Sequence, residues 1–146
     1  MGAAKRIVHP TDFSTASEPA FTDALERAQR EGAELILVHV LDPIVGLSDE
    51  MYIAKRLELR EVSEARARRD FERLLARAKK AGVPASDVLA DGWAPDEIAR
   101  IAKARGADLI VMGTHGRTGI RKLLLGSVAE RVIGMAPCPV LTVRAS

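Results

Sequence analysis

Short apolar segments alternate with longer helical patterns along the whole chain, and this alternation restricts the possible folds more than any other feature of the sequence. Residues 35–40 and 109–112 are nearly continuous runs of aliphatic side chains. Strands that are buried on both faces of a parallel sheet have this composition, whereas half-exposed strands alternate apolar and polar residues. Strands are therefore expected at residues 6–9, 35–40, 88–90, 109–112 and 140–143.

The segments between these strands have helical periodicity and carry helix-end signals. Three of them finish with basic residues followed by glycine, at Gly32, Gly82 and Gly106. Cations oppose the helix dipole there, and glycine adopts the left-handed conformation that ends a helix. The last segment has Ser127 and Glu130 at the spacing of a capping box. Helices are therefore expected at about residues 15–31, 51–81, 95–105 and 127–135.

Four strand–helix units followed by a fifth strand predict the class α/β, because parallel strands require crossover connections. The expected fold is a single doubly wound, five-stranded parallel sheet with helices on both faces, Rossmann-like in architecture. A length of 146 residues fits one domain, so residues 1–146 are expected to form a single domain. Ligands of such folds bind at the carboxyl ends of the strands.

The composition disfavours several classes of protein. The chain is 47% hydrophobic and 29% charged, as expected of a folded domain. A net charge of +2 and an aromatic content of 3% give no basic field and few stacking rings, so no nucleic-acid partner is expected. No apolar run approaches the roughly 20 residues that cross a bilayer, and no secretion signal or lipid-attachment motif is evident. The single cysteine, Cys138, cannot form an intrachain disulfide, and a cytoplasmic setting is expected.

The segment after the expected fourth strand carries the clearest chemical signal. Residues 113–119 read Gly-Thr-His-Gly-Arg-Thr-Gly, and residues 126–127 place glycine and serine before the last helix. Glycines let a backbone approach a ligand closely, and free N–H groups at a helix N-terminus bind anions. Arg117, Arg121 and Lys122 add cations, which favours a phosphate site. The alternative is that the glycines only shape the loop, the serine only caps its helix and the cations are solvated.

The loop matches neither common phosphate-binding fingerprint, G-x-x-x-x-G-K-S/T or G-x-G-x-x-G. It instead resembles the signature G-x2-G-x9-G-S/T of the universal stress protein family, formed here by Gly113, Gly116, Gly126 and Ser127. The resemblance extends over the chain, to the family's first strand and turn, second strand, phosphate loop and last strand at residues 5–14, 37–40, 112–116 and 138–144. It implies the strand order 3-2-1-4-5 and a single universal-stress-protein-like nucleotide-binding domain over residues 1–146.

One branch of that family binds ATP and keeps the glycine signature, and the resemblance places this chain in that branch. It implies an adenine nucleotide as ligand, ATP with Mg²⁺. The loop and helix backbones would hold the ribose and phosphates, and the backbone of Val40 would meet the adenine. The implied nucleotide-binding residues are Pro10, Thr11, Asp12, Val40, Gly113, Thr114, His115, Gly116, Arg117, Thr118, Gly119, Gly126, Ser127 and Val128.

Asp12 is the acidic residue expected beside the ligand. Its carboxylate would accept a hydrogen bond from a ribose hydroxyl or contact Mg²⁺ carried by the phosphates. The alternative is that Asp12 only organises the turn into the first helix. No metal site made by the protein alone is expected, and His9 and His39 are expected to be core or sheet-end histidines.

The resemblance also implies a homodimer, in which the C-terminal strand pairs with its copy in a second chain. That strand comprises Val140, Leu141, Thr142 and Val143. The chain departs from the family at Trp93, where a small or polar residue is usual. Trp93 either narrows the site or packs at the surface.

The long helix expected at residues 51–81 carries many arginines among interleaved acids. Glu64 with Arg68, and Arg66 with Asp70, have the spacing of helical ion pairs, which favours a solvated surface over a nucleic-acid face. The core-facing stripe of this helix is expected to be Leu57, Phe71, Leu74, Leu75 and Ala78.

Three functions fit these features. The first is an ATP-binding universal stress protein, a homodimeric, nucleotide-dependent regulatory or stress-response protein. The second is a slow Mg²⁺-dependent ATP hydrolase, and the third is a ligand-free dimeric interaction module, which the complete glycine signature disfavours. No residue is an evident general base or holder of a water molecule, so catalytic residues are not assigned and any ATP turnover is expected to be slow.

Overall fold

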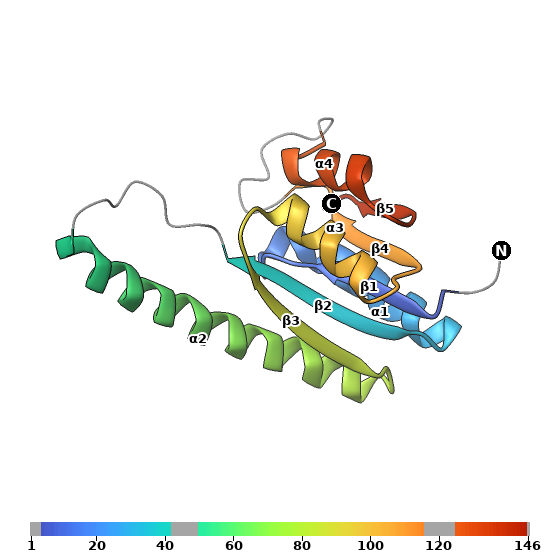
Figure 1. Cartoon of the computed structure of the whole chain (residues 1–146). Helices are drawn as coiled ribbons and strands as arrows, with labels where there is room; N and C mark the ends of the chain where they lie inside the picture. The colour runs from blue at the N-terminus through green and yellow to red at the C-terminus, as the bar shows by residue number, and fades with distance from the viewer. Residues whose placement is uncertain (1–3, 42–49, 116–124, 146) are drawn as a thin grey trace.

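Five parallel strands form one sheet in a computed structural model of the chain, which describes residues 4–41, 50–115 and 125–145. The strands are β1 (Arg6–Pro10), β2 (Glu34–Leu41), β3 (Ala85–Asp91), β4 (Leu109–Gly113) and β5 (Val140–Val143). A 3₁₀ turn at Thr15–Ser17 precedes α1 (Glu18–Glu31), and the later helices are α2 (Glu50–Lys80), α3 (Ala94–Ala104) and α4 (Ser127–Met135). The sheet order is β3-β2-β1-β4-β5, which confirms the predicted class and topology (Figure 1).

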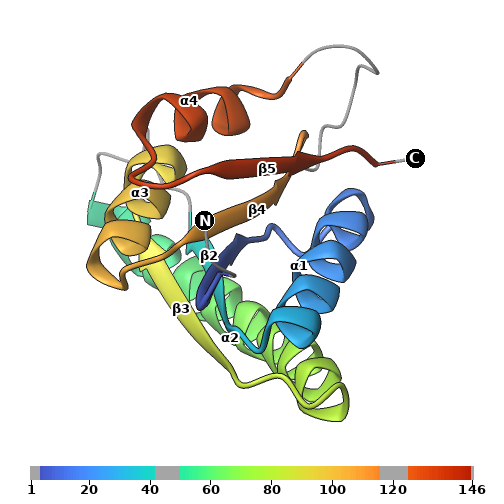
Figure 2. The same cartoon turned by 90° about the vertical axis from the view of Figure 1, so that its right-hand side faces the viewer.

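Successive residues of the central strands face opposite layers of helices. Ile7 and Leu35 point into a core built with α1 and α2, while Val8 and Ile36 point into a second core built with α3 and α4. The helices therefore cover both faces of the sheet, as Figure 2 shows. Burial on both sides explains why these strands are continuous aliphatic runs rather than alternating ones.

The glycines predicted to end three helices are confirmed, whereas the predicted capping box at the start of α4 is wrong. Gly32, Gly82 and Gly106 all have positive φ angles, 67°, 74° and 64°, which a residue without a Cβ adopts at little cost. At α4, however, the N-cap is Gly126, with an extended backbone (φ −64°, ψ 155°) and no side-chain cap. Ser127 is the first helical residue, one position too late for its hydroxyl to cap.

The long helix α2 packs on the sheet only through its C-terminal half. Phe71 and Leu74 are buried against the α1 face, but Leu57 is 61% exposed, so its predicted place in the core was wrong. A helix of 31 residues is about 46 Å long, whereas the eight-residue strand β2 spans about 26 Å. The N-terminal half of α2 therefore extends past the sheet (Figure 1).

The ion pairs of α2 differ from those predicted. Glu64 pairs with Arg60, and Asp70 lies 3.9 Å from Arg73, so neither pairs with the partner expected from the sequence. Arg60 also forms an ion pair with Asp91, which links α2 to the carboxyl end of β3. Even this longest helix is strongly charged, and no helix in the described part of the chain is apolar enough to cross a membrane.

His9 is a fully buried histidine in the centre of β1. Its Nδ1–H donates to the Val111 carbonyl at 2.8 Å, while its Nε2 is buried without a hydrogen-bond partner. Burial lowers the pKa of His9 from 6.5 to about 4, against smaller opposing effects of the Val111 hydrogen bond, Glu18 and Asp12. The folded protein therefore holds His9 neutral at a pH at which the unfolded chain would protonate it.

This difference predicts pH-dependent stability. Between pH 6.5 and about 4 the unfolded chain binds a proton at His9 that the folded chain does not, so the free energy of unfolding falls as the pH is lowered. The shift corresponds to about 3 kcal/mol over that window. Urea denaturation across pH 4 to 7 should show this slope for the unaltered protein and a flatter profile for His9→Gln. Equal slopes for both proteins would contradict the assignment of this pH dependence to His9.

Candidate functional site

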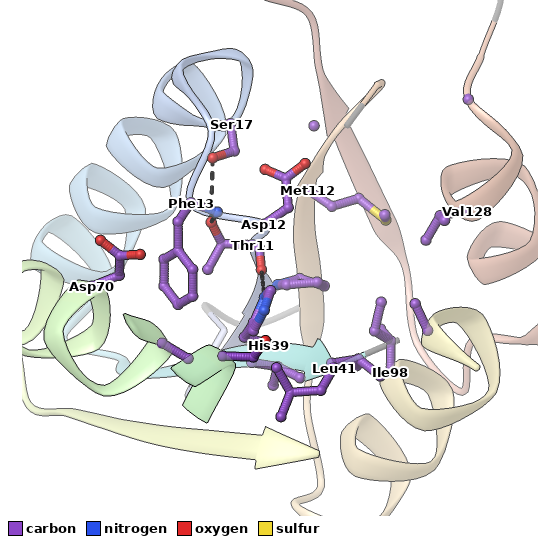
Figure 3. A pocket seen from close by; sticks show the side chains of 18 of the residues that line it. Thr11, Asp12, Phe13, Ser17, His39, Leu41, Asp70, Ile98, Met112 and Val128 are labelled. Atoms are coloured by element: carbon purple, nitrogen blue, oxygen red, sulfur yellow. Dashed lines mark hydrogen bonds between the residues drawn. The ribbon is translucent and has the colours of Figure 1, made fainter. Parts of the chain in front are cut away.

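A cavity of about 710 Å³ opens at the carboxyl ends of β1, β2 and β4. It lies at the point where the strand order reverses, between β1 and β4, which is where open α/β sheets bind ligands. Figure 3 shows Thr11 and His39 at its centre, Asp70 and Phe13 on the α2 side, and Ile98, Met112 and Val128 on the side of α3 and α4. The sheet topology thus brings distant segments of the chain to one pocket.

Every predicted site residue that the structure describes lines this pocket. They are Pro10, Thr11, Asp12, Val40, Gly113, Thr114, His115, Gly126, Ser127 and Val128. The remaining predicted residues, and the loop cations predicted to accompany them, lie outside the described residues: Gly116, Arg117, Thr118, Gly119, Arg121 and Lys122.

The turn after β1 is held by a dense set of hydrogen bonds. Oδ1 of Asp12 accepts the backbone N–H of Ser14 at 2.9 Å and its hydroxyl at 2.5 Å. The Thr11 hydroxyl oxygen accepts the Phe13 N–H at 2.9 Å and lies 3.2 Å from the hydroxyl of Ser17. Asp12 therefore does organise the turn, as its alternative interpretation held, and it lines the pocket as well.

His39 supports this turn from the neighbouring strand. Its Nδ1 lies 2.7 Å from the Thr11 carbonyl oxygen, and since a carbonyl only accepts, Nδ1 carries the proton. The ring also lies against Phe13, with centroids 4.7 Å apart. His39 is thus a sheet-end histidine with a partner, as predicted, and it lines the pocket, which the sequence did not indicate.

Gly126 is required by a close approach between two backbones. Its N–H donates to the Thr114 carbonyl at 2.7 Å, and a Cβ at this position would lie 2.7 Å from the same oxygen. Its φ of −64° is an ordinary angle, so the need for glycine arises from space and not from a left-handed backbone. At Gly113 an added Cβ would meet the His115 carbonyl at 3.3 Å, a tighter contact than most side chains make.

The beginning of α4 lines the pocket and carries backbone N–H groups without intrahelical partners. The first intrahelical bond runs from Glu130 N–H to the Gly126 carbonyl, so the N–H groups of Ser127 and Val128 have no partner within the helix. These donors and the positive end of the helix dipole suit an anion. Next to this helix start, Oγ1 of Thr114 lies 3.1 Å from Nδ1 of His115.

The pocket wall on the side of α3 and α4 is apolar. Val40 and Met112 contribute buried side chains from the sheet, and Ile98 contributes one from α3. Such a wall suits a flat, apolar ligand surface, and the anion donors of α4 lie beside it. The pocket therefore fits a ligand with an apolar ring at one end and a negative group at the other.

The wall contributed by α2 was missed by the sequence analysis. Leu59, Ser63, Arg66 and Asp70 line the pocket from this helix. Their spacing of four, three and four residues places them on one helical face, which was the only available signal. Trp93, by contrast, is 64% exposed and is not among the lining residues, so the surface alternative for Trp93 is the one observed.

No group of three or more histidine, cysteine, aspartate or glutamate side chains is placed to bind a metal ion within the described ranges 4–41, 50–115 and 125–145. The fold and the pocket define a class, the doubly wound α/β proteins with a ligand crevice at the topological switch point. The universal stress protein family matches residues 3–144, and the chain belongs to this family.

Two curated relatives come from Methanocaldococcus jannaschii. Universal stress protein MJ0531 is 40% identical over 144 residues, which cover 96% of this chain and 82% of that protein. Universal stress protein MJ0577 is 31% identical over 154 residues, which cover 96% of this chain and 94% of that protein.

Solved structures share the fold. Hypothetical protein MJ0577 superposes with a TM-score of 0.84 at 32% identity, covering 99% of this chain and 98% of that one. A universal stress protein in complex with cAMP has a TM-score of 0.73 at 26% identity, covering 99% and 100%. The universal stress protein from Archaeoglobus fulgidus in complex with dAMP has a TM-score of 0.68 at 25% identity, covering 97% and 99%.

The close approach at Gly126 predicts that alanine has a different effect at the N-cap of α4 than inside the helix. Gly126→Ala should lower the free energy of unfolding by about 1 to 3 kcal/mol, because the Cβ forces the helix start away from Thr114. Gly134 is the matched control, since a Cβ there meets nothing within 4 Å, and Gly134→Ala should be neutral or stabilising by about 0.5 to 1 kcal/mol. Denaturant unfolding of both variants checks this. Equal effects at the two positions would show that the Thr114 contact does not restrict residue 126.

Proposed function

We propose that the protein is an ATP-binding universal stress protein that acts as a homodimeric, nucleotide-dependent regulator. The observation that carries the proposal is the arrangement of the pocket, which three regions line. The first is the start of α4, where position 126 has room only for glycine, the second is Asp12, and the third is the apolar wall beside Val40. A phosphate chain, a ribose and an adenine would occupy these three regions. Two structures of the same fold were solved with the adenine nucleotides cAMP and dAMP, which supports this class of ligand.

The described residues suit each part of ATP. The N–H groups of Ser127 and Val128 would bind phosphate oxygens, and the glycine at 126 lets the helix start sit close enough to Thr114 to hold these groups in place. The carboxylate of Asp12 would accept a hydrogen bond from the ribose. Mg²⁺ would neutralise the phosphates, and Asp12 is the carboxylate of the β1 turn that could contact it.

A chain of backbone hydrogen bonds joins this site to the edge of the sheet. The Val143 carbonyl of β5 accepts the Thr114 N–H at 3.1 Å, and the Thr114 carbonyl accepts the Gly126 N–H at 2.7 Å. A ligand that moves the start of α4 would therefore act on β5 through Thr114, in addition to the core that α4 and β5 share. This connection supports a role in which nucleotide occupancy changes how β5 meets a partner.

The outer edge of β5 is the proposed dimer interface. β5 is the last strand in the sheet order, and the carbonyls of Pro139 and Val143 face β4, where they accept N–H donors. Because alternate residues point to opposite edges, Leu141 also faces β4, whereas Thr142 faces outward. The adjacent helix α4 exposes Ile133 and Met135, each 48% exposed, and these apolar side chains would extend the same interface.

A reducing, cytoplasmic setting is part of the proposal. Cys138 is the only cysteine and is a free thiol. Burial raises its pKa, with a smaller contribution from Asp108, so the thiol stays protonated and weakly nucleophilic.

Nucleotide binding is tested by calorimetry with ATP and Mg²⁺. The unaltered protein should bind ATP, and Gly126→Ala should weaken binding at least tenfold because it displaces the phosphate-binding N–H groups. Gly134 lies inside α4, where an added Cβ meets nothing within 4 Å, so Gly134→Ala should bind ATP as the unaltered protein does. Absence of ATP binding by the unaltered, folded protein would refute the proposed function.

The dimer is tested by an edge-specific substitution. Thr142→Pro removes an outward N–H while leaving the donors that face β4, so it should shift a sedimenting dimer toward monomer with the fold intact. Leu141→Pro instead removes a donor that faces β4 and should destabilise the fold. A monomeric unaltered protein at micromolar concentration, or a Thr142→Pro variant as dimeric as the parent, would contradict the proposed interface.

A further inference from the structure

Phe13 has an unusual backbone conformation directly beside the pocket. Its φ of 62° is the only positive φ among the non-glycine residues that the structure describes. A bulky side chain rarely adopts this conformation, because its Cβ crowds the adjoining carbonyl group. Strain of this kind persists only where surrounding interactions hold it, and such strain is concentrated at functional sites.

The aromatic ring of Phe13 supplies the interactions that hold the turn. It lies 4.7 Å from the ring of His39, in a tilted arrangement, and meets the ring of Phe71 edge to face at 5.1 Å. The ring thus anchors the turn to β2 and to α2 at once. The backbone is fixed from the other side, since the Phe13 N–H donates to the Thr11 hydroxyl at 2.9 Å.

At the left-handed residue Phe13, the turn sends the side chains of Phe13 and Asp12 in different directions. Figure 3 shows the Phe13 ring on the α2 side of the pocket and the Asp12 carboxylate pointing away from it. Asp12 Oδ1 is fixed by the N–H and hydroxyl of Ser14, which follows Phe13 in the chain. The conformation at Phe13 therefore sets where Ser14 lies, and through Ser14 it sets the plane of the carboxylate.

We propose that Phe13 is a positioning residue, whose anchored ring holds the strained turn that aims Asp12 at the ribose hydroxyls of the bound nucleotide. This inference rests on the proposed function and adds to it a determinant of ribose recognition. The Phe13 ring lines the α2 side of the pocket, and the Asp12 carboxylate points away from it. The effect of Phe13 on the ribose is exerted through Ser14 and Asp12.

The experiment compares ATP with 2′,3′-dideoxy-ATP, both with Mg²⁺, by calorimetry. A hydrogen bond to a carboxylate should make the unaltered protein prefer ATP by about tenfold or more. Asp12→Asn should reduce this preference severalfold, and Phe13→Leu should reduce it in the same way although Asp12 is intact. If Phe13→Leu does not fold, Phe13→Gly provides the same test, because glycine tolerates the positive φ and lacks the ring.

Phe21→Leu is the matched control. Phe21 is 1% exposed in the same core, its ring lies 5.8 Å from the His9 ring, and the Arg77 guanidinium lies 4.6 Å from the centre of the Phe21 ring. This variant should lose stability yet keep the preference for ATP.

Folded Phe13 variants that keep the full preference for ATP, or that bind both nucleotides more weakly by the same factor, would overturn the positioning role. The proposal of nucleotide binding would still stand. Equal binding of both nucleotides by the unaltered protein would overturn it too, because Asp12 would then not contact the ribose. Failure of the unaltered protein to bind either nucleotide would instead refute the proposed function itself.

Discussion

The start of α4 is held against the carboxyl end of β4 by direct backbone contact, with the Gly126 N–H donating to the Thr114 carbonyl at 2.7 Å. No side chain fits between the two segments, so this contact fixes where the free N–H groups of the helix lie. The Thr114 N–H is in turn bonded to Val143, which joins the helix start to the last strand. The pocket, its donors for an anion and the edge of the sheet thus depend on one short connection.

The elements and the α/β class could be predicted from periodicity, because a parallel sheet covered on both faces leaves a distinctive pattern, whereas the strand order came from the family resemblance. Residues 35–40 and 109–112 became the buried parts of β2 and β4, and the glycines at helix ends have the left-handed angles expected of them. The errors in the predicted core arose where a local residue pattern disagrees with the size of the sheet. Leu57 has the spacing of a core residue, but its helix is too long for the sheet to cover it.

The site could be predicted only in part. The glycine signature and the family resemblance it carries indicated residues that the structure brings to one pocket, since all of them lie near the carboxyl ends of strands or at the start of α4. The α2 wall could not be predicted, because Arg66 and Asp70 have the composition of a solvated helical surface. The left-handed angle of Phe13 was equally hidden, since aspartate and serine turns usually form without such strain.

A crystal structure of the protein with a non-hydrolysable ATP analogue and Mg²⁺ tests the central claim most directly. The account predicts the adenine against Val40 and Met112, the ribose hydroxyls at Asp12 and phosphate oxygens within hydrogen-bond distance of the N–H groups of Ser127 and Val128. A nucleotide bound outside this pocket, or one whose phosphates face α2 instead of α4, would contradict the account.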